Sequence, residues 1–339
     1  MVTTMKDIAR ELGVSIVTVS RALREGSGMS ASTRGRILRR ARELNYRPNL
    51  AARALVTGRS KQIGLIVPDL VHSLFATVAL SAAAELRSQG YSLIISSSEG
   101  DPQLEIFEID QMLMRGVDAL ILASTQSTVE HFYKIGHQRL CFLLLDRKIP
   151  GLEVDFVGVD DVMAGTLATR HLLEIGRRTI AHIPGPDISS AFDRQAGYRM
   201  ELARRDMNLP SRYLAKGIVA DNNDAFGYTA MKGLMSLRPR PDGVFCYSDR
   251  IAMGAMRAIF DAGLRVPEDI ALVGCGNVAY ADSLRVPLTS IDLDSKQLGE
   301  RAAKMVLGIL RRRGRPAARS VLMPPLLVVR DSTQRQCPR

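Results

Sequence analysis

Residues 4–23, TMKDIARELGVSIVTVSRAL, predict two short helices joined by a tight turn. Thr4 can cap the first helix, and Asp7 stands three positions on, where a capping box needs an acceptor. Gly13 can adopt the left-handed conformation that ends a helix, and Ser15 can cap the second helix. This order is typical of a helix-turn-helix, whose second helix enters the major groove of DNA.

The outward side chains of the second helix suit contact with a duplex. Val19, Ala22 and Leu23 can turn inward toward a third helix, which follows Ser30 or Ser32. The outward residues combine apolar groups, which suit thymine methyls, with hydroxyls and a guanidinium, which suit phosphates and guanine. The predicted base contacts are Ile16, Val17 and Arg21, and the predicted phosphate or nearby contacts are Thr4, Ser15, Thr18, Ser20 and Asn49.

Positive charge is concentrated in the same region. The chain has 339 residues and a formal net charge of +11. Residues 1–61 hold 13 Lys or Arg and 4 acidic residues, whereas the other 278 residues hold 33 and 31. A small basic module in front of a nearly neutral body favours a polyanionic partner. The alternatives are a solvated basic segment and a three-helix domain that contacts no DNA.

A short Ala-rich segment, NLAARALVT, lies between Pro48 and Gly58. A helix this short is marginal in water, so we expect it to order on a partner. Small side chains such as Ala52 let two such helices approach closely, and Leu55 could wedge between base pairs in the minor groove. A plain linker is the alternative.

From Gln62 onward, short apolar runs alternate with helical segments. Buried strands are predicted over residues 63–67, 92–96, 119–123 and 141–145, then 179–183, 214–219, 244–247 and 270–273. Helices are predicted over residues 75–89, 102–115, 127–135, 162–175, 191–205, 225–237 and 251–262, with Gly90, Gly116 and Gly136 ending the first three. Repeated βα units imply parallel sheets covered on both faces, and two series imply two lobes. The predicted fold class is α/β, with a three-helix head and a two-lobed core.

These motifs, in this order, resemble the lactose-repressor (LacI/GalR) family of bacterial transcription regulators. The matching runs are TMKDIA (4–9), GVS (13–15), TVSR (18–21), NYRPN (45–49), IGLIVP (63–68), HLLEIG (171–176), AGYR (196–199), AMGA (252–255) and PPLLVVRDST (324–333). The resemblance covers essentially the whole chain. It implies a sequence-specific DNA-binding regulator, expected to be a repressor, with a periplasmic-binding-protein-like core. Such a protein works as a homodimer on a pseudo-palindromic operator, under the control of a small-molecule effector.

The resemblance also implies a division of the chain. Residues 1–48 form the helix-turn-helix domain, 49–61 a hinge helix and linker, 62–331 the two-lobed effector-binding and dimerisation domain, and 332–339 a tail. The chain is expected to cross between the lobes near residues 160, 290 and 320. The tail carries no leucine heptads, so nothing indicates a tetramer-forming coiled coil.

The family binds its effectors in the cleft between the lobes. Arg194 stands where the family has an effector-binding arginine, and a planar guanidinium can hold vicinal hydroxyls or a carboxylate. This chain departs from the family where Asn222 replaces a stacking aromatic, where Gly276 replaces an Asp, and where His72-Ser73 replaces Asn-Pro. These departures favour an anionic effector, such as a sugar acid or sugar phosphate, over a neutral sugar; loss of small-molecule control is an alternative. The predicted effector contacts are His72, Leu74, Phe75, Asp146, Arg147, Arg194, Asn222, Ser248, Asp249 and Asn277.

The sequence offers little support for an enzyme or a metalloprotein. None of the five histidines forms an H-x-x-x-H pair, and the Gly274-x-Gly276 pair lacks a phosphate-binding fingerprint. We therefore expect no catalytic residues, no metal and no cofactor. The four cysteines form no C-x-x-C pair, which fits a reducing cytoplasm.

Membrane and secreted classes are also disfavoured. No apolar stretch approaches the roughly 18 residues of a membrane span, and the first residues lack the apolar core of a signal peptide. A solute-binding receptor of a transport system shares the two-lobed fold and is the alternative function. Such a receptor should carry a secretion signal and no basic head, and this chain shows the reverse pattern.

Overall fold

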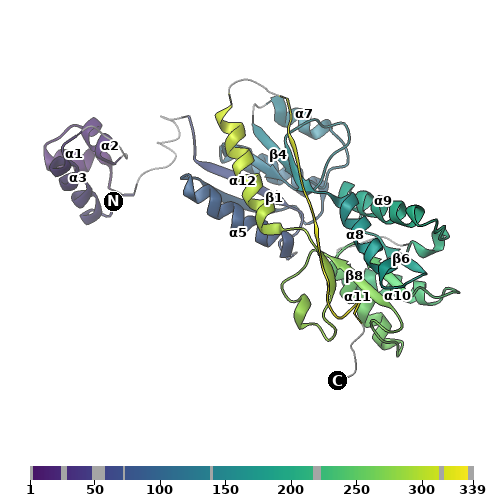
Figure 1. Ribbon diagram of the computed structural model, residues 1–339. Helices are drawn as coiled ribbons and strands as arrows, with labels where there is room; N and C mark the ends of the chain where they lie inside the picture. The colour runs from purple at the N-terminus through teal and green to yellow at the C-terminus, as the bar shows by residue number, and fades with distance from the viewer. Residues whose placement is uncertain are drawn as a thin grey trace. The chain divides into compact units, whose positions relative to one another are not determined.

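The structure is a computed structural model that describes residues 3–23, 29–47, 58–71, 73–137, 140–216, 223–312 and 317–334. The chain divides into two compact units, a head (Met1–Ser60) and a core (Lys61–Arg339). Figure 1 shows the helices in the described part of the head and the α/β organisation of the core. The fold class predicted from the sequence is confirmed.

The described part of the head is built from α1 (Met5–Leu12), α2 (Ile16–Leu23) and α3 (Ala31–Glu43). The predicted capping box is present, because the Thr4 hydroxyl accepts from the Asp7 amide and the Asp7 carboxylate accepts from the Thr4 amide. Gly13 ends α1 with a φ of 62°. Ser30, rather than Ser32, caps α3. One small core joins the three helices, made of Ile8, Ala9, Val19, Ala22, Ile37 and Ala41.

The first lobe of the core is a parallel sheet with the strand order β10-β5-β4-β3-β1-β2. Its strands are β1 (Gln62–Val67), β2 (Ser92–Ser97), β3 (Ala119–Leu122), β4 (Cys141–Leu145), β5 (Phe156–Val159) and β10 (Ser320–Met323). Its helices are α5 (Ser73–Ser88), α6 (Pro102–Met114), α7 (Glu130–His137) and α12 (Ser295–Arg311). Leu65 packs with α5 and α12, whereas its neighbour Ile66 packs with α6 and α7. Successive apolar side chains of β1 therefore point to opposite faces of the sheet and join the apolar core on each side.

The second lobe has the strand order β11-β9-β8-β7-β6. Its strands are β6 (Ile180–Ile183), β7 (Gly243–Cys246), β8 (Ala271–Cys275), β9 (Thr289–Asp292) and β11 (Leu326–Val328). Its helices are α8 (Asp161–Glu174), α9 (Ser189–Arg204), α10 (Asn223–Met235) and α11 (Asp249–Asp261), with short 3-10 turns at Ser211–Tyr213 and Ala281–Ser283. Helices α8 and α9 cover one face and α10 and α11 the other. Only β11 pairs antiparallel among the described strands.

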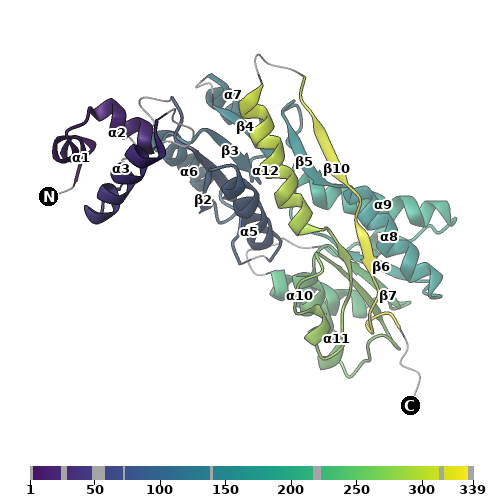
Figure 2. The same ribbon diagram turned by 60° about the vertical axis from the view of Figure 1, so that its left-hand side comes forward.

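The chain passes between the lobes at three places. It leaves β5 for α8 at Asp160, leaves β9 for α12 at residues 293–294, and leaves β10 for β11 at residues 324–325. Figure 2 shows β10 running beside β5 before the chain enters the second lobe. Connections of this kind allow two lobes to move as hinged bodies around a ligand.

One expectation about the core is wrong and a second is only partly covered by the described residues. Residue 136 does not end a helix, because α7 begins at Glu130 and continues to His137; glycine ends a helix only where it takes the left-handed conformation, as Gly90 and Gly116 do. Of the strand expected over residues 214–219, the described residues 214–216 form one parallel bridge, between Leu214 and His182. Residues 217–222 lie outside the described part of the chain.

His182 is a fully buried histidine in the second sheet. Its ring stacks between Tyr198 and Phe245, with ring centroids 5.3 Å and 4.8 Å away. Nδ1 lies 2.9 Å from the Phe245 carbonyl oxygen and donates to it, while Nε2 has no hydrogen-bond partner among the described residues. Burial lowers the pKa of His182 from its ordinary 6.5 to about 4.

This shift makes the core sensitive to acid. Below pH 6.5 the unfolded chain is protonated at His182, whereas the folded chain becomes protonated there only near pH 4. The free energy of unfolding therefore falls as the pH drops from about 6.5 to about 4. Between pH 7.5 and pH 5 we expect His182 to account for a loss of about 2 kcal/mol. Urea unfolding at both pH values, compared with His182→Phe, measures the difference. Equal pH dependence in the two proteins would contradict this assignment.

Candidate functional sites

The surface of α2 carries apolar side chains that the fold does not use. Ile16 is 42% exposed and Val17 62% exposed, whereas Val19 and Ala22 are buried in the head's core. Arg21 is exposed beside them. Exposed aliphatic groups next to a guanidinium offer both methyl contacts and a forked donor, which is the chemistry needed to distinguish base edges.

Three of the predicted phosphate contacts, Thr4, Ser15 and Thr18, have hydroxyls engaged within the head. The Thr4 hydroxyl donates to Asp7 at 2.7 Å, and the Ser15 hydroxyl accepts from the Thr18 amide at 3.0 Å. Both residues therefore cap helices. Thr18 and Ser20 are half-buried on α2. The predicted contacts Asn49, Ala52 and Leu55 lie outside the described residues.

The positive charge of the head is distributed over several helices. Arg40 is paired with Glu11 and Glu43, so its charge is largely offset. Arg36, Arg39 and Arg42 are exposed on α3, in addition to Arg21 on α2. Their summed field attracts a polyanion without selecting a sequence.

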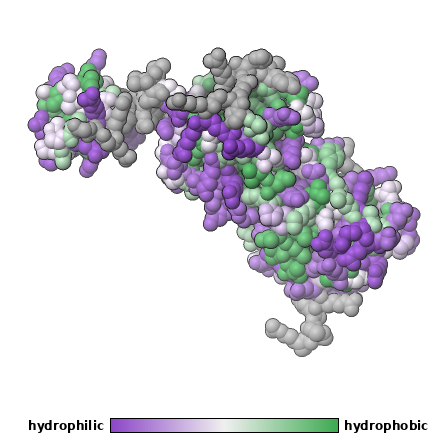
Figure 3. All heavy atoms as spheres, turned by 45° about the horizontal axis from the view of Figure 1, so that its top comes forward, coloured by the Kyte–Doolittle hydropathy of each residue, from purple (hydrophilic) through white to green (hydrophobic). Residues whose placement is uncertain are grey.

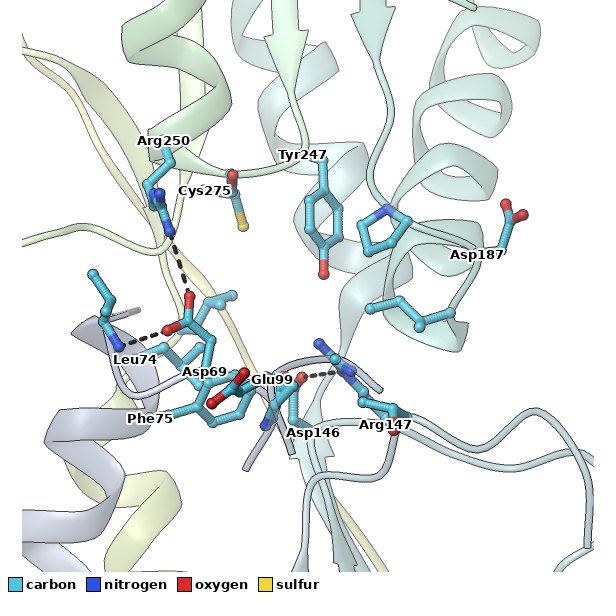
Figure 4. A pocket seen from close by; sticks show the side chains of 18 of the residues that line it. Asp69, Leu74, Phe75, Glu99, Asp146, Arg147, Asp187, Tyr247, Arg250 and Cys275 are labelled. Carbon is cyan, nitrogen blue, oxygen red and sulfur yellow. Dashed lines mark hydrogen bonds and ion pairs between the residues drawn. The ribbon is translucent and has the colours of Figure 1, made fainter. Parts of the chain in front are cut away.

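The core contains a cleft of about 620 Å³ between its two lobes. Residues of the first lobe line it from the ends of β1, β2 and β4, and residues of the second lobe line it from α9, the end of β7 and the start of α11. Ligands bind parallel α/β sheets outside the carboxyl ends of the strands, which is where this cleft lies. The side chains labelled in Figure 4 are Asp69, Leu74, Phe75, Glu99, Asp146, Arg147, Asp187, Tyr247, Arg250 and Cys275.

Arg194 is held rigidly at the base of the cleft. It is 3% exposed, its Nε donates to Asp161 at 2.7 Å, and its Nη1 donates to the Tyr247 carbonyl at 2.8 Å. The guanidinium carbon lies 4.6 Å from the centre of the Tyr247 ring. Burial acts to lower the pKa of Arg194, but attraction to Asp161, together with smaller contributions from neighbours such as Asp146, raises it above its ordinary value, so the guanidinium stays charged.

The position of Arg194 follows from close packing of α8 against α9. A Cβ on Gly165 would lie 2.0 Å from the Arg194 carbonyl oxygen, and a Cβ on Gly197 would lie 2.0 Å from the Val162 carbonyl oxygen. Only glycine permits this approach. The same approach brings Asp161, at the start of α8, within reach of Arg194. Burial raises the pKa of Asp161 to about 7, and Arg194 opposes that rise.

Asp146 and Arg147 form a polar strip on the first lobe. Asp146 follows β4 with a φ of 64°, the left-handed conformation, which Asp adopts more readily than most residues with a side chain. Arg147 Nε lies 3.7 Å from the Asp146 carboxylate and is buried without a hydrogen-bond partner among the described residues. Figure 4 shows Arg147 pointing into the cleft below Tyr247.

The structure brings six of the predicted effector residues to this cleft: Leu74, Phe75, Asp146, Arg147, Arg194 and Ser248. Asp249 and Asn277 are not among the described residues that line it. The Asp249 carboxylate accepts from Ser290 Oγ and the Val278 amide, and the Asn277 side chain bonds to Asp292 and Arg330. Their polar groups hold the lobe together instead. His72 and Asn222 lie outside the described residues.

Sequence reasoning missed several cleft residues. Tyr247 stands directly before Ser248, at the end of β7, so the strand position could have indicated it. Its ring fits only because Gly185 has no side chain; a Cβ there would lie 2.5 Å from the ring. Its hydroxyl lies 3.2 Å from Ser190 Oγ. Asp69, Glu99, Thr125, Asp187 and Arg250 also line the cleft.

The positive charges in the cleft are fully offset by carboxylates. Each lining guanidinium has a carboxylate neighbour: Arg147 has Asp146, Arg194 has Asp161, and Arg250 has Asp69 and Asp224. Glu99 and Asp187 add further carboxylates to the lining. The cleft therefore offers many donors and acceptors without an excess of positive charge.

No helix among the described residues is long and apolar enough to cross a membrane. No group of three or more His, Cys, Asp or Glu side chains within the described ranges is placed to hold a metal ion.

Comparison with known families matches both units. Residues 4–49 match the family described as bacterial regulatory proteins, lacI family, and residues 169–333 match the periplasmic binding protein-like domain. Among curated proteins, the chain is 30% identical to the HTH-type transcriptional repressor PurR of Klebsiella pneumoniae (strain 342), over 97% of this chain and 96% of that protein. It is also 30% identical to the ribose operon repressor of Escherichia coli (strain K12), over 90% of this chain and 92% of that protein.

Solved structures agree with these matches. The lac repressor bound to ONPG in the repressed state superposes with a TM-score of 0.85 at 25% identity, covering 98% of this chain and 100% of that chain. The lac repressor dimer bound to operator and the anti-inducer ONPF also gives a TM-score of 0.85 at 25% identity, covering 98% and 99%.

Proposed function

This chain belongs to the LacI family of bacterial regulatory proteins and is a DNA-binding transcriptional repressor under small-molecule control, and we propose how its residues divide that work. The head reads the operator and the cleft of the core holds the effector. The relatives are repressors rather than transport receptors or enzymes, which removes the alternative function.

The working unit is a homodimer on a pseudo-palindromic operator. The lac repressor, whose dimer has been solved on its operator, supports this arrangement. Two heads related by two-fold symmetry would occupy adjacent half-sites. Large apolar side chains left exposed on the core, such as Leu80 on α5 and Met114 on α6, support a protein–protein surface. Figure 3 shows apolar surface on the core, with the strongest patch on the lobe nearer the C-terminus. We place the protein in the cytoplasm, where bacterial DNA lies.

Within the head, Ile16, Val17 and Arg21 read base edges. The observation that supports this is their exposure on α2 next to a well-packed core, since nothing in the head itself requires apolar side chains there. The residues that contact the DNA phosphates or lie beside them are Thr4, Ser15, Thr18, Ser20 and Asn49. Ala52 and Leu55 belong to the hinge segment over residues 49–61, which orders on the minor groove.

The effector is a polar molecule of the sugar type, and the cleft favours a neutral one. The carboxylates that offset the positive charges of the lining carry this proposal, because an acidic effector would need an unneutralised guanidinium and each one here has a carboxylate beside it. An anionic effector, which the departures from the family sequence favour, is disfavoured by these neighbouring carboxylates.

A thermal-shift screen of the purified protein tests the effector class. Neutral sugars, the matching sugar acids and the sugar phosphates are compared at equal concentration, followed by calorimetry of any hit. We expect a neutral sugar to stabilise the core, by about 2.7 kcal/mol at a hundred times its Kd. Binding by the acids and phosphates with none by neutral sugars would restore the anionic hypothesis and reject this one.

A further inference from the structure

An ion pair joins the two lobes across the cleft. The Arg250 guanidinium, at the start of α11 in the second lobe, lies 3.4 Å from the carboxylate of Asp69, which follows β1 in the first lobe. The same guanidinium lies 3.4 Å from Asp224, in the first turn of α10 in its own lobe. Figure 4 shows Arg250 reaching toward Asp69 at one side of the cleft. Arg250 thus connects carboxylates that belong to different lobes.

The local structure directs Asp69 at its partner. Asp69 Oδ1 accepts from the Val71 amide at 2.6 Å, which leaves Oδ2 as the oxygen facing Arg250. A second contact between the lobes is the Lys148 amide, which donates to Ser189 Oγ at 2.8 Å. Lys148 follows β4 in the first lobe and Ser189 begins α9 in the second. This amide reports on lobe separation, because its acceptor belongs to the other lobe.

We infer that Asp69 and Arg250 are positioning residues that hold the lobes in the arrangement seen here, and that effector binding acts on this pair. Both residues line the cleft, so a ligand hydroxyl bonded to either one changes the strength of the pair. A ligand can shift the lobes only through such differential contacts. The link to operator affinity rests on the proposed function, whereas the link to lobe position does not.

The chain offers a matched pair of variants. Asp69→Asn and Asp224→Asn each remove one carboxylate charge 3.4 Å from the same guanidinium, and the two side chains are similarly exposed, at 38% and 43%. Asn at position 69 can still accept from the Val71 amide. Only Asp69→Asn removes a contact between lobes. Arg250→Gln removes both pairs and serves as the second variant.

Hydrogen–deuterium exchange of the intact protein, without DNA or ligand, tests the positioning role. In Asp69→Asn and Arg250→Gln we expect the peptide containing the Lys148 amide to exchange roughly two- to fivefold faster than in the unaltered protein, as suits a partly exposed ion pair. Asp224→Asn should leave that rate unchanged. Unchanged exchange in both variants, or equal acceleration in Asp224→Asn, would overturn the inference.

Binding to the protein's own upstream DNA tests the link to regulation. Asp69→Asn should change the affinity by roughly two- to fivefold while Asp224→Asn does not. Faster exchange with unchanged DNA affinity would retain the positioning role and reject the regulatory one. Failure of every variant to bind DNA would count against the proposed function and leave the exchange result intact.

Discussion

Replacing Arg194 by methionine is expected to lower the free energy of unfolding of the core by about 3–5 kcal/mol. The change leaves the Asp161 carboxylate buried without its partner and the Tyr247 carbonyl without its donor. Removing one member of a buried pair costs far more than the pair contributes, because the Asp161 carboxyl, whose pKa burial already raises to about 7, must then stay charged without a partner or take up a proton. Denaturant unfolding of the intact protein, followed by circular dichroism, measures this loss.

A second variant separates stability from effector binding. In Arg194→Met with Asp161→Leu, both charges are gone, so most of the lost stability should return. The double variant should nevertheless fail to respond to any effector, because the guanidinium at the base of the cleft is missing. A single variant as stable as the unaltered protein would contradict the account of this pair. So would a double variant that is stable and still responds fully to effector.

Arg21→Gln is expected to weaken binding to the operator by about 1–3 kcal/mol, a factor of roughly 5 to 150, with little change on unrelated DNA. Arg21 is exposed on α2, so its loss should leave folding of the head unchanged. Fluorescence anisotropy with labelled duplexes, at several salt concentrations, measures both affinities. The prediction depends on Arg21 contacting a base edge rather than only a phosphate.

Arg39→Gln is the matched control for Arg21→Gln. It removes the same charge from an exposed residue of the same head, on α3 rather than α2. If a positive charge acts only by attracting the DNA phosphates, its removal should lower the affinities for operator and for unrelated DNA by similar factors. It should also reduce the dependence of the affinity on salt concentration. Equal behaviour of the two variants would place Arg21 among the non-specific contacts.

The head was predictable in detail because its signals are local. Thr4, Asp7 and Gly13 act through neighbours three to five residues away, and each takes the role that its spacing indicated. The alternation of strands and helices in the core was predictable for the same reason. The helix end predicted at residue 136 was wrong because glycine occurs inside helices as well as after them, and only the backbone angle φ distinguishes the two cases.

The cleft was only partly predictable because it is assembled from distant segments. Tyr247 and Arg250 lie beside residues that the resemblance indicated, but which side chain faces the cleft depends on how each strand end turns. Asp249 illustrates the difficulty: it follows Ser248 directly, yet it turns inward to Ser290 and the Val278 amide. The pairing of cleft arginines with carboxylates could not be predicted from the sequence, because Asp161 contacts Arg194 only through the packing of α8 on α9.

The most direct test of the whole account is the affinity of the intact protein for its own upstream region, compared with a scrambled duplex of equal length. We expect a preference of at least about a thousandfold at physiological salt. The compound found by the thermal-shift screen should then change the specific affinity by roughly 5- to 150-fold. Equal binding to both duplexes, with the compound present or absent, would contradict the claim that the head reads sequence under the control of the core.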